Sequence, residues 1–170
     1  NMVQTGLEQL LSGDYPKLKQ ARMGLILNHT SVDRTLRLSV ELLTQQGYQI
    51  KKIFAPEHGF RGDVPAGEMV QHTIDEQTGI SVYSLYGSNK RPSPEMLEDL
   101  DVLVFDMQDI GVRFYTYIYT MAYTLEAAGS LGIDYVVLDR PNPITGTKVE
   151  GNVVQEGFDS FVGQYGLPIR

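Results

Sequence analysis

Val102-Leu103-Val104-Phe105-Asp106 is a run of four apolar residues that ends on a carboxylate. Three further segments repeat this design, and stretches with helical periodicity separate them. They are Met23-Gly24-Leu25-Ile26-Leu27 before Asn28, Ile53-Phe54-Ala55-Pro56 before Glu57, and Tyr135-Val136-Val137-Leu138 before Asp139. Continuous apolar runs that alternate with helices are typical of parallel strands buried on both faces. The pattern predicts an α/β fold, with an open, mainly parallel sheet and helices on both faces.

The polar residues that close these runs are expected to share one edge of the sheet. Parallel strands all point the same way, so Asn28, Glu57, Asp106 and Asp139 should lie at the carboxyl edge. Open α/β sheets bind their ligands at that edge. The sequence therefore predicts the place of a site from its strand pattern alone.

The intervening segments predict several helices and some weaker strands. Thr5 and Glu8 are spaced as a capping box and predict a short N-terminal helix that ends at Gly13. A second helix is expected around Leu36, Val40 and Leu43, with Asp33 or Thr35 as its cap and Gly47 as its stop. Ser93-Pro94-Glu95 has the composition of a helix start. Short strands are expected at residues 80–86, 149–154 and 160–162.

A longer helix is predicted from near Arg113 to Gly129 or Gly132. Its apolar stripe is expected to consist of Phe114, Ile118, Met121 and Leu125, at spacings of four, three and four. The same helix is crowded with tyrosines. We expect Tyr115 and Tyr117, near its start, to be partly exposed at the sheet edge, where tyrosine suits stacking on sugar rings.

Length and composition limit the function classes. The chain has 170 residues without an internal repeat or linker, so we expect one domain over residues 1–170. It has no cysteine, and its net charge of -7 argues against a nucleic-acid partner. No apolar run approaches the ~20 residues of a membrane span. Glycine-rich phosphate-binding loops are absent from the sequence, so nucleotide binding has no support and no cofactor is expected. The G-x-S-x-G elbow that carries a serine nucleophile is absent as well.

Glu57 and its neighbours are the first candidates for chemistry. Glu57 follows a strand end, where partial burial would raise its pKa enough for general acid catalysis. The alternative is a carboxylate that caps a turn. His58 is equally compatible with ligand contact and with a backbone-bonded turn, and Arg61 adds a cation nearby.

Asp106, Gln108 and Asp109 are the second group. A carboxylate at the end of an apolar strand is costly to bury unless it is paired, and Arg113 or Arg140 would supply the partner. Asp106 is therefore a candidate for catalysis or for a structural ion pair, and Asp109 is a candidate for catalysis or for capping a turn.

The third group is the loop Asp139-Arg140-Pro141-Asn142-Pro143. Its prolines restrict the backbone on both sides, which favours a binding role for Arg140 and Asn142 over a merely tight turn. The three histidines have no metal-site spacing. A divalent metal ion held by Glu57, Asp106 and Asp139 is a further alternative.

Four ordered motifs resemble one known family. They are Leu27-Asn28-His29-Thr30-Ser31-Val32-Asp33, Pro56-Glu57-His58-Gly59-Phe60-Arg61-Gly62-Asp63, Val104-Phe105-Asp106-Met107-Gln108-Asp109-Ile110-Gly111-Val112-Arg113-Phe114-Tyr115-Thr116-Tyr117 and Leu138-Asp139-Arg140-Pro141-Asn142-Pro143. Together they resemble the NamZ-type exo-β-N-acetylmuramidases, from about Val3 to Arg170. The resemblance implies release of terminal N-acetylmuramic acid from the non-reducing end of peptidoglycan fragments by a periplasmic or secreted parent protein. It also implies a Rossmann-like N-terminal lobe and a C-terminal lobe, which is absent from this chain, with the active site between them.

The resemblance places the general acid on Glu57. Asp106 or Asp109 would be the second carboxylate, or the acetamido group of the sugar would attack while a carboxylate orients it. The lactyl carboxylate of the substrate needs a cation, for which Arg61, Arg113 and Arg140 are candidates. Two other functions stay open: a non-catalytic saccharide-binding module, and a metal-dependent hydrolase that uses the strand-end carboxylates.

Overall fold

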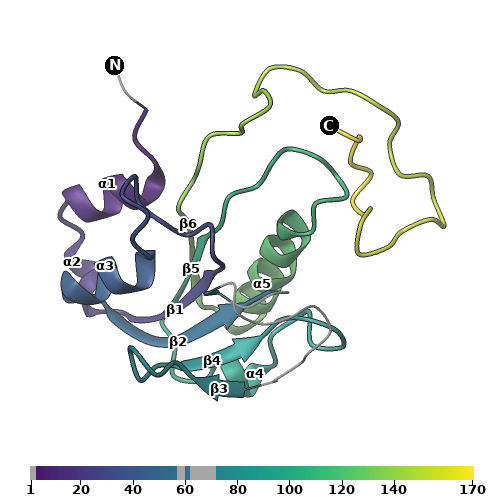
Figure 1. The fold of residues 1–170 in the computed structure, drawn as a ribbon. Helices are drawn as coiled ribbons and strands as arrows, with labels where there is room; N and C mark the ends of the chain where they lie inside the picture. Colours follow the sequence, from purple (N-terminus) through teal and green to yellow (C-terminus); the bar gives the residue numbers. More distant parts are fainter. Residues whose placement is uncertain (1–2, 57–59, 62–71) are drawn as a thin grey trace.

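Five parallel strands and one antiparallel strand form the sheet in the computed structural model, which describes residues 3–56, 60–61 and 72–170 (Figure 1). In chain order the strands are β1 (Arg22–Leu27), β2 (Gln49–Ala55), β3 (His72–Ile74), β4 (Ser81–Ser84), β5 (Val102–Asp106) and β6 (Asp134–Val137). Their order across the sheet is β3-β4-β2-β1-β5-β6, and β3 pairs antiparallel with β4. The predicted α/β class and the mainly parallel sheet are confirmed. The antiparallel β3 was not predicted.

The winding of the chain reverses between β1 and β5. From β1 the chain first adds β2 and β4 on one side of the sheet, then crosses back to add β5 and β6 on the other. Leu27 is paired with Asp106, and Phe105 with Val137, so the strand ends are level. The prediction that Asn28, Asp106 and Asp139 share one edge is thus confirmed, whereas Glu57 lies outside the described residues. A reversal of this kind is where doubly wound sheets open a crevice for ligands.

Helices cover both faces of the sheet, as predicted (Figure 1). Helices α1 (Gly6–Ser12), α2 (Pro16–Gln20) and α3 (Ser39–Gln45) pack on one face, and α4 (Pro94–Leu97) and α5 (Tyr117–Leu131) on the other. Alternate residues of β1 serve the two cores: Leu25 and Leu27 face the first, and Ile26 faces the second. Among the described helices, none is long and apolar enough to cross a membrane.

The predicted capping box at the start of α1 is present. The backbone amide of Thr5 donates to Glu8 at 2.8 Å, and the amide of Glu8 donates to the Thr5 hydroxyl at 3.2 Å. Gly6 then donates its backbone N–H to the carbonyl oxygen of Asp139 at 2.7 Å. A Cβ on Gly6 would lie 2.5 Å from the Asp139 nitrogen, so glycine is required at this contact. The start of α1 is therefore fastened to the loop that follows β6.

Two predicted helix starts were wrong by about one turn. The helix expected around Leu36 begins only at Ser39, because Asp33 accepts hydrogen bonds from the backbone amides of Thr35 and Arg37 and closes a turn first. Leu36 has a φ of 63° in that turn and is 79% exposed. Helix α5 begins at Tyr117 instead of near Arg113. Its predicted end at Gly132 is confirmed, with a φ of 68°.

The predicted apolar stripe of α5 was also wrong. Phe114 and Leu125 are 61% and 48% exposed. The buried side chains are Tyr117, Tyr119, Thr120, Thr124, Ala127 and Ala128. A stripe drawn through apolar residues missed the threonines, which can be buried because their hydroxyls bond within the helix. The Thr124 hydroxyl, for example, donates to the Thr120 carbonyl at 2.8 Å.

Residues 139–170 contain no helix and none of the short strands predicted at residues 149–154 and 160–162. The backbone of Glu150 pairs instead with that of Arg170, and Gly151 takes a φ of 86° that interrupts an extended run. Ser160 and Gly163 form an isolated bridge. The segment packs on α5 through Phe161, whose ring lies 5.8 Å from that of Tyr123.

Candidate active site at the carboxyl edge of the sheet

The loops that follow β1, β5 and β6 are bonded to one another at the carboxyl edge, where the last two rise together in Figure 1. The Ser31 hydroxyl donates to the carbonyl oxygen of Asp106. The backbone amide of Gln108 donates to the Thr30 hydroxyl at 3.0 Å, and its side chain donates to the carbonyl of Pro141 at 2.9 Å. Gln108, predicted to bind substrate, thus ties three loops together.

Thr30 and Ser31 were not predicted as site residues. A signal was present, because asparagine, serine and threonine side chains close together after a strand are typical of turns closed by side-chain hydrogen bonds, and Thr30 and Ser31 stand two and three residues after Asn28. Asn28 is fully buried at the end of β1, and its side-chain oxygen accepts from the amide of Thr30 at 2.9 Å and from its hydroxyl at 2.6 Å. The Asn28 amide nitrogen is buried without an acceptor in the described part of the chain.

Asp106 forms a buried ion pair with Arg140. The Asp106 side chain is fully buried and that of Arg140 is 7% exposed. Arg140 Nε lies 2.7 Å from one carboxylate oxygen and its Nη2 lies 3.1 Å from the other, while Nη1 donates to the Val32 carbonyl at 3.1 Å. Of the two partners expected for Asp106, the structure therefore selects Arg140. Both carboxylate oxygens are held, which favours a structural role for Asp106 over catalysis.

The two carboxylate oxygens of Asp109 differ in their hydrogen bonding. Its Oδ2 accepts the backbone N–H of Gly111 at 2.7 Å, so the predicted turn-capping role is present. Its Oδ1 is buried and has no hydrogen-bond partner in the described residues. Burial raises the pKa of Asp109, against the opposing effect of the Gly111 and Ile110 amides. Among the predicted catalytic carboxylates in the described residues, Asp109 has the better chemistry for moving a proton or accepting a ligand N–H.

Asn142 packs directly on Gly111. Gly111 has a φ of 72°, and a Cβ there would lie 2.0 Å from the Asn142 amide nitrogen. The Asn142 side-chain oxygen accepts from the amide of Ile144 at 2.9 Å. Asp139 and Asn142 are both exposed. These contacts place the loop after β6 against the loop that carries Asp109.

The expectation that Tyr117 is partly exposed was wrong. It is 8% exposed, because the first residue of α5 faces the core between the helix and the sheet. Tyr115, which precedes the helix, is half-buried as expected, and its ring lies 4.8 Å from the ring of Tyr117 in an edge-on arrangement.

The remaining predicted site residues differ in their surroundings. Arg61 bonds both oxygens of Asp75, at 2.8 and 2.9 Å, and approaches Glu41 at 3.3 Å. Arg113 donates to the main-chain carbonyls of Asn152 and Leu167, at 2.7 and 2.9 Å, and so fastens the C-terminal segment. Glu57 and His58 lie outside the described residues.

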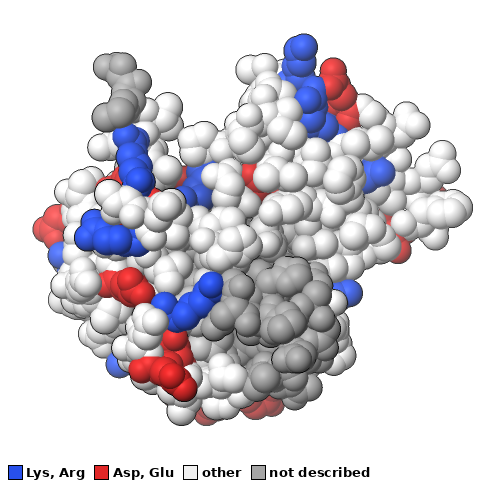
Figure 2. All heavy atoms as spheres, viewed as in Figure 1, with Lys and Arg blue, Asp and Glu red and all other residues white. Residues whose placement is uncertain are grey.

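A metal centre finds no support within residues 3–56, 60–61 and 72–170. No three histidine or acidic side chains come together there in a way that would hold a metal ion. Both oxygens of Asp106 already face the Arg140 guanidinium, which would repel a cation. On the described part of the face in Figure 2, acidic and basic side chains are interspersed, without a wide area of one sign.

Two cavities adjoin Asp109. One, of about 220 Å³, lies between the ends of β5 and β6 and the first turns of α5. The other, of about 340 Å³, lies under the C-terminal segment and is lined by Arg113, Lys148 and Asn142 among others. Asp109 and Ile118 line both.

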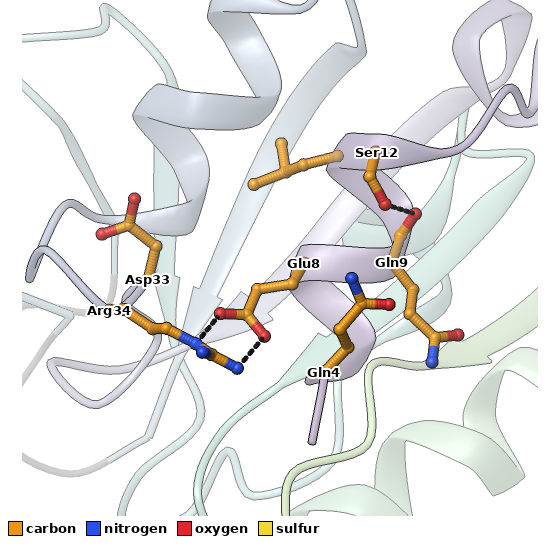
Figure 3. Close-up of a pocket in the computed structure, with 7 residues that line it drawn as sticks. Gln4, Glu8, Gln9, Ser12, Asp33 and Arg34 are labelled. Carbon is orange, nitrogen blue, oxygen red and sulfur yellow. Dashed lines mark hydrogen bonds and ion pairs between the residues drawn. The ribbon is translucent and has the colours of Figure 1, made fainter. Parts of the chain in front are cut away.

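A larger cavity, of about 640 Å³, lies beside α1 (Figure 3). Its charged side chains are already paired: Glu8 binds Arg34 within the lining, and Asp33 binds Arg37, which lies outside it, at 2.9 Å. The hydrogen bond from the Thr5 amide, followed by the one from Arg34, lowers the pKa of Glu8, which is the wrong direction for a proton donor. The Asp109 region is therefore the better candidate site.

Comparison with known proteins agrees with this fold. The sequence profile described as "Exo-beta-N-acetylmuramidase NamZ, N-terminal" matches residues 23–170. The chain is 50% identical over 169 residues to the peptidoglycan beta-N-acetylmuramidase NamZ of Bacillus subtilis (strain 168), covering 99% of this chain and 41% of that protein.

Two solved structures of DUF1343 family proteins from Bacteroides fragilis NCTC 9343 have similar folds. The first has a TM-score of 0.89 at 46% identity and the second a TM-score of 0.84 at 34% identity. They match 98% and 99% of this chain but only 42% and 43% of their own lengths. The chain therefore spans less than half the length of these relatives.

Proposed function

Because the chain belongs to the family defined by the N-terminal part of the exo-β-N-acetylmuramidase NamZ, we propose that it is the corresponding part of a peptidoglycan-processing glycosidase. Its parent protein would release N-acetylmuramic acid from the non-reducing end of peptidoglycan fragments. The observation that carries the proposal is the match over residues 23–170, which includes the whole carboxyl edge with Asp109.

The proposed chemistry uses two carboxyl groups. Glu57, which follows β2 in the motif that resembles the family, is the general acid that protonates the leaving oxygen. Asp109 is the second group, in preference to Asp106, because one of its oxygens has no partner among the described residues, while both oxygens of Asp106 bind Arg140. Glycoside hydrolysis requires such a pair, one to protonate and one to stabilise or attack.

Arg113 is the proposed partner of the substrate's lactyl carboxylate. Arg61 and Arg140 are already paired with Asp75 and Asp106, and a third charge would have to compete with those carboxylates. Arg113 donates to neutral carbonyls and lines the 340 Å³ cavity with Lys148. A guanidinium and an ammonium group beside Asp109 suit a small carboxylate.

The proposed active enzyme is the longer parent protein. This chain covers 41% of the Bacillus relative, and we propose that a C-terminal lobe of the same polypeptide supplies the opposite wall of the site. Exposed apolar side chains on the C-terminal segment, such as Val149 and Phe158 at 76% and 75%, are compatible with such a neighbour. The parent would act where peptidoglycan fragments occur, in the periplasm or outside the cell.

The test is the turnover of a chromogenic β-N-acetylmuramide by the full-length parent and its Glu57→Gln variant. We expect activity in the parent and a loss of roughly 100- to 10,000-fold in the variant, the usual contribution of a general acid. Folded Glu57→Gln protein with parental rates would reject the assignment. Binding of the sugar without turnover by the parent would indicate a saccharide-binding module, and loss of activity with a chelator would indicate a metal-dependent hydrolase.

A further inference from the structure

The 220 Å³ cavity behind Asp109 has a mostly apolar wall. Phe105 and Met107 from the end of β5, Ile118 and Met121 from α5, and Val137 from β6 supply that wall. Asp109 and Arg140 are among its polar members. The wall contains two methionines, whose unbranched side chains adapt to a ligand at low cost. The cavity thus combines an apolar surface with a carboxylate.

Within the described residues, the carboxylate of Asp109 is hydrogen-bonded through one oxygen only. Asp109 Oδ2 is fixed by the Gly111 amide, which sets the orientation of the group, and Oδ1 has no donor in the described part of the chain. The Arg140 guanidinium in the same wall is committed to Asp106 and to the Val32 carbonyl. A buried acceptor without a partner costs free energy, so a ligand that brings an N–H group would be favoured here.

We propose that this cavity receives the 2-acetamido group of the sugar, and that Asp109 accepts its amide N–H. An acetamido group carries one N–H donor and one methyl group, and these match the unpaired oxygen and the apolar wall. A hydroxyl group would leave the apolar wall unused, and a carboxylate would bring no N–H for Asp109 and would find Arg140 already bound to Asp106. The inference rests on the proposed function, since it names the route by which that site hydrolyses the glycoside.

With its N–H bound to Asp109, the acetamido group of the substrate is itself the nucleophile. The acetamido oxygen attacks C1 while the bond from C1 to the leaving oxygen breaks, and the general acid gives that oxygen its proton. The amide nitrogen becomes positively charged in the resulting oxazolinium ion, which Asp109 stabilises through the N–H. Water then attacks C1, its proton returns to the general acid, and the acetamido group is regenerated. Two displacements at C1 retain the β configuration.

The experiment uses the full-length parent with aryl β-muramides that carry acetyl, fluoroacetyl, difluoroacetyl or trifluoroacetyl groups at nitrogen. Fluorine withdraws electrons from the acyl oxygen, so we expect kcat to fall at each step, with the β anomer formed first. Asp109→Asn should lower kcat by about 100- to 1,000-fold, the usual loss of one preorganised electrostatic partner. Asparagine can still accept the Gly111 N–H, which preserves the turn.

Asp134→Asn is the matched control, because it makes the same change in an exposed aspartate at the opposite end of β6. It should keep the parental kcat and the same dependence on fluorine. Three results would overturn this inference and leave the proposed function standing. They are a kcat that does not change with fluorine, an α anomer as the first product, and an Asp109→Asn variant whose kcat is within about twofold of the parent. A parent that hydrolyses none of the four substrates would overturn the proposed function itself, and this inference with it.

Discussion

Replacing Arg140 with methionine should destabilise the 170-residue chain strongly. The change keeps most of the side-chain volume but leaves the Asp106 carboxylate, which is fully buried, without its two hydrogen bonds of 2.7 and 3.1 Å. Removing one partner of a buried ion pair costs about 3–5 kcal/mol, because the other charge stays buried and uncompensated. The lost bond to the Val32 carbonyl adds about 1 kcal/mol.

The assay is urea denaturation at pH 7, with the free energy of unfolding extrapolated to water. The double variant Asp106→Leu/Arg140→Met should be more stable than Arg140→Met, because replacing both partners leaves no unpaired charge. Arg22→Met is the control, since its pair with Asp101 is 47% and 45% exposed and screened by solvent, so that its loss should change the unfolding free energy far less than Arg140→Met does. A loss below about 1 kcal/mol for Arg140→Met would refute the view of Asp106 as a structural anchor.

Three further predictions concern stability. Gly6→Ala should lower the unfolding free energy by about 1–3 kcal/mol, because the added Cβ would meet the backbone of Asp139. Gly129→Ala should raise it by about 0.5–1 kcal/mol, because Gly129 has open space in α5. Urea titrations that give both variants the same change would contradict the contact between Gly6 and Asp139. Asp109→Asn should stabilise the fold at pH 7 and not at pH 4. Burial raises the pKa of Asp109, so folding favours its neutral form, and this contribution to stability is lost as the pH rises and the carboxyl ionises. Equal urea midpoints for variant and parent at pH 7 would count against the burial of Asp109. The chain should also lose stability as pH falls from about 4 towards 2, because two carboxylates have lowered pKa values and lose their favourable bonds when they are protonated. The hydrogen bond from Arg61 lowers the pKa of Asp75. Burial would raise the pKa of Asp33, but hydrogen bonds from Arg37 and Thr35 outweigh it and bring that pKa to about 2. Thermal melts that do not change over that range would disprove this assignment.

The place of the site could be predicted because it depends on local pattern. An apolar run that stops at Asn28 or Asp106 marks both the strand and its end, and parallel pairing then brings those ends together. The caps at Thr5 and Ser93 depend on a few adjacent residues and were equally readable.

The partners within the site depend on tertiary structure and could not be predicted in the same way. Whether Asp106 binds Arg113 or Arg140 is decided by how the loop after β6 crosses the edge of the sheet, which no spacing along the chain encodes. The burial of Tyr117 follows from the face that α5 presents, and two buried threonines hid that face from an apolar pattern. That Asp109 Oδ1 has no hydrogen-bond partner among the described residues depends on how the loops after β5 and β6 pack together, which no local pattern specifies.

The most direct test of the account is a crystal structure of the full-length parent with N-acetylmuramic acid bound. We expect the sugar at the carboxyl edge of the sheet, beside the ends of β5 and β6, with its acetamido N–H within hydrogen-bond distance of Asp109. A sugar bound in the cavity beside α1, or at the carboxyl edge with its acetamido group turned away from Asp109, would contradict it.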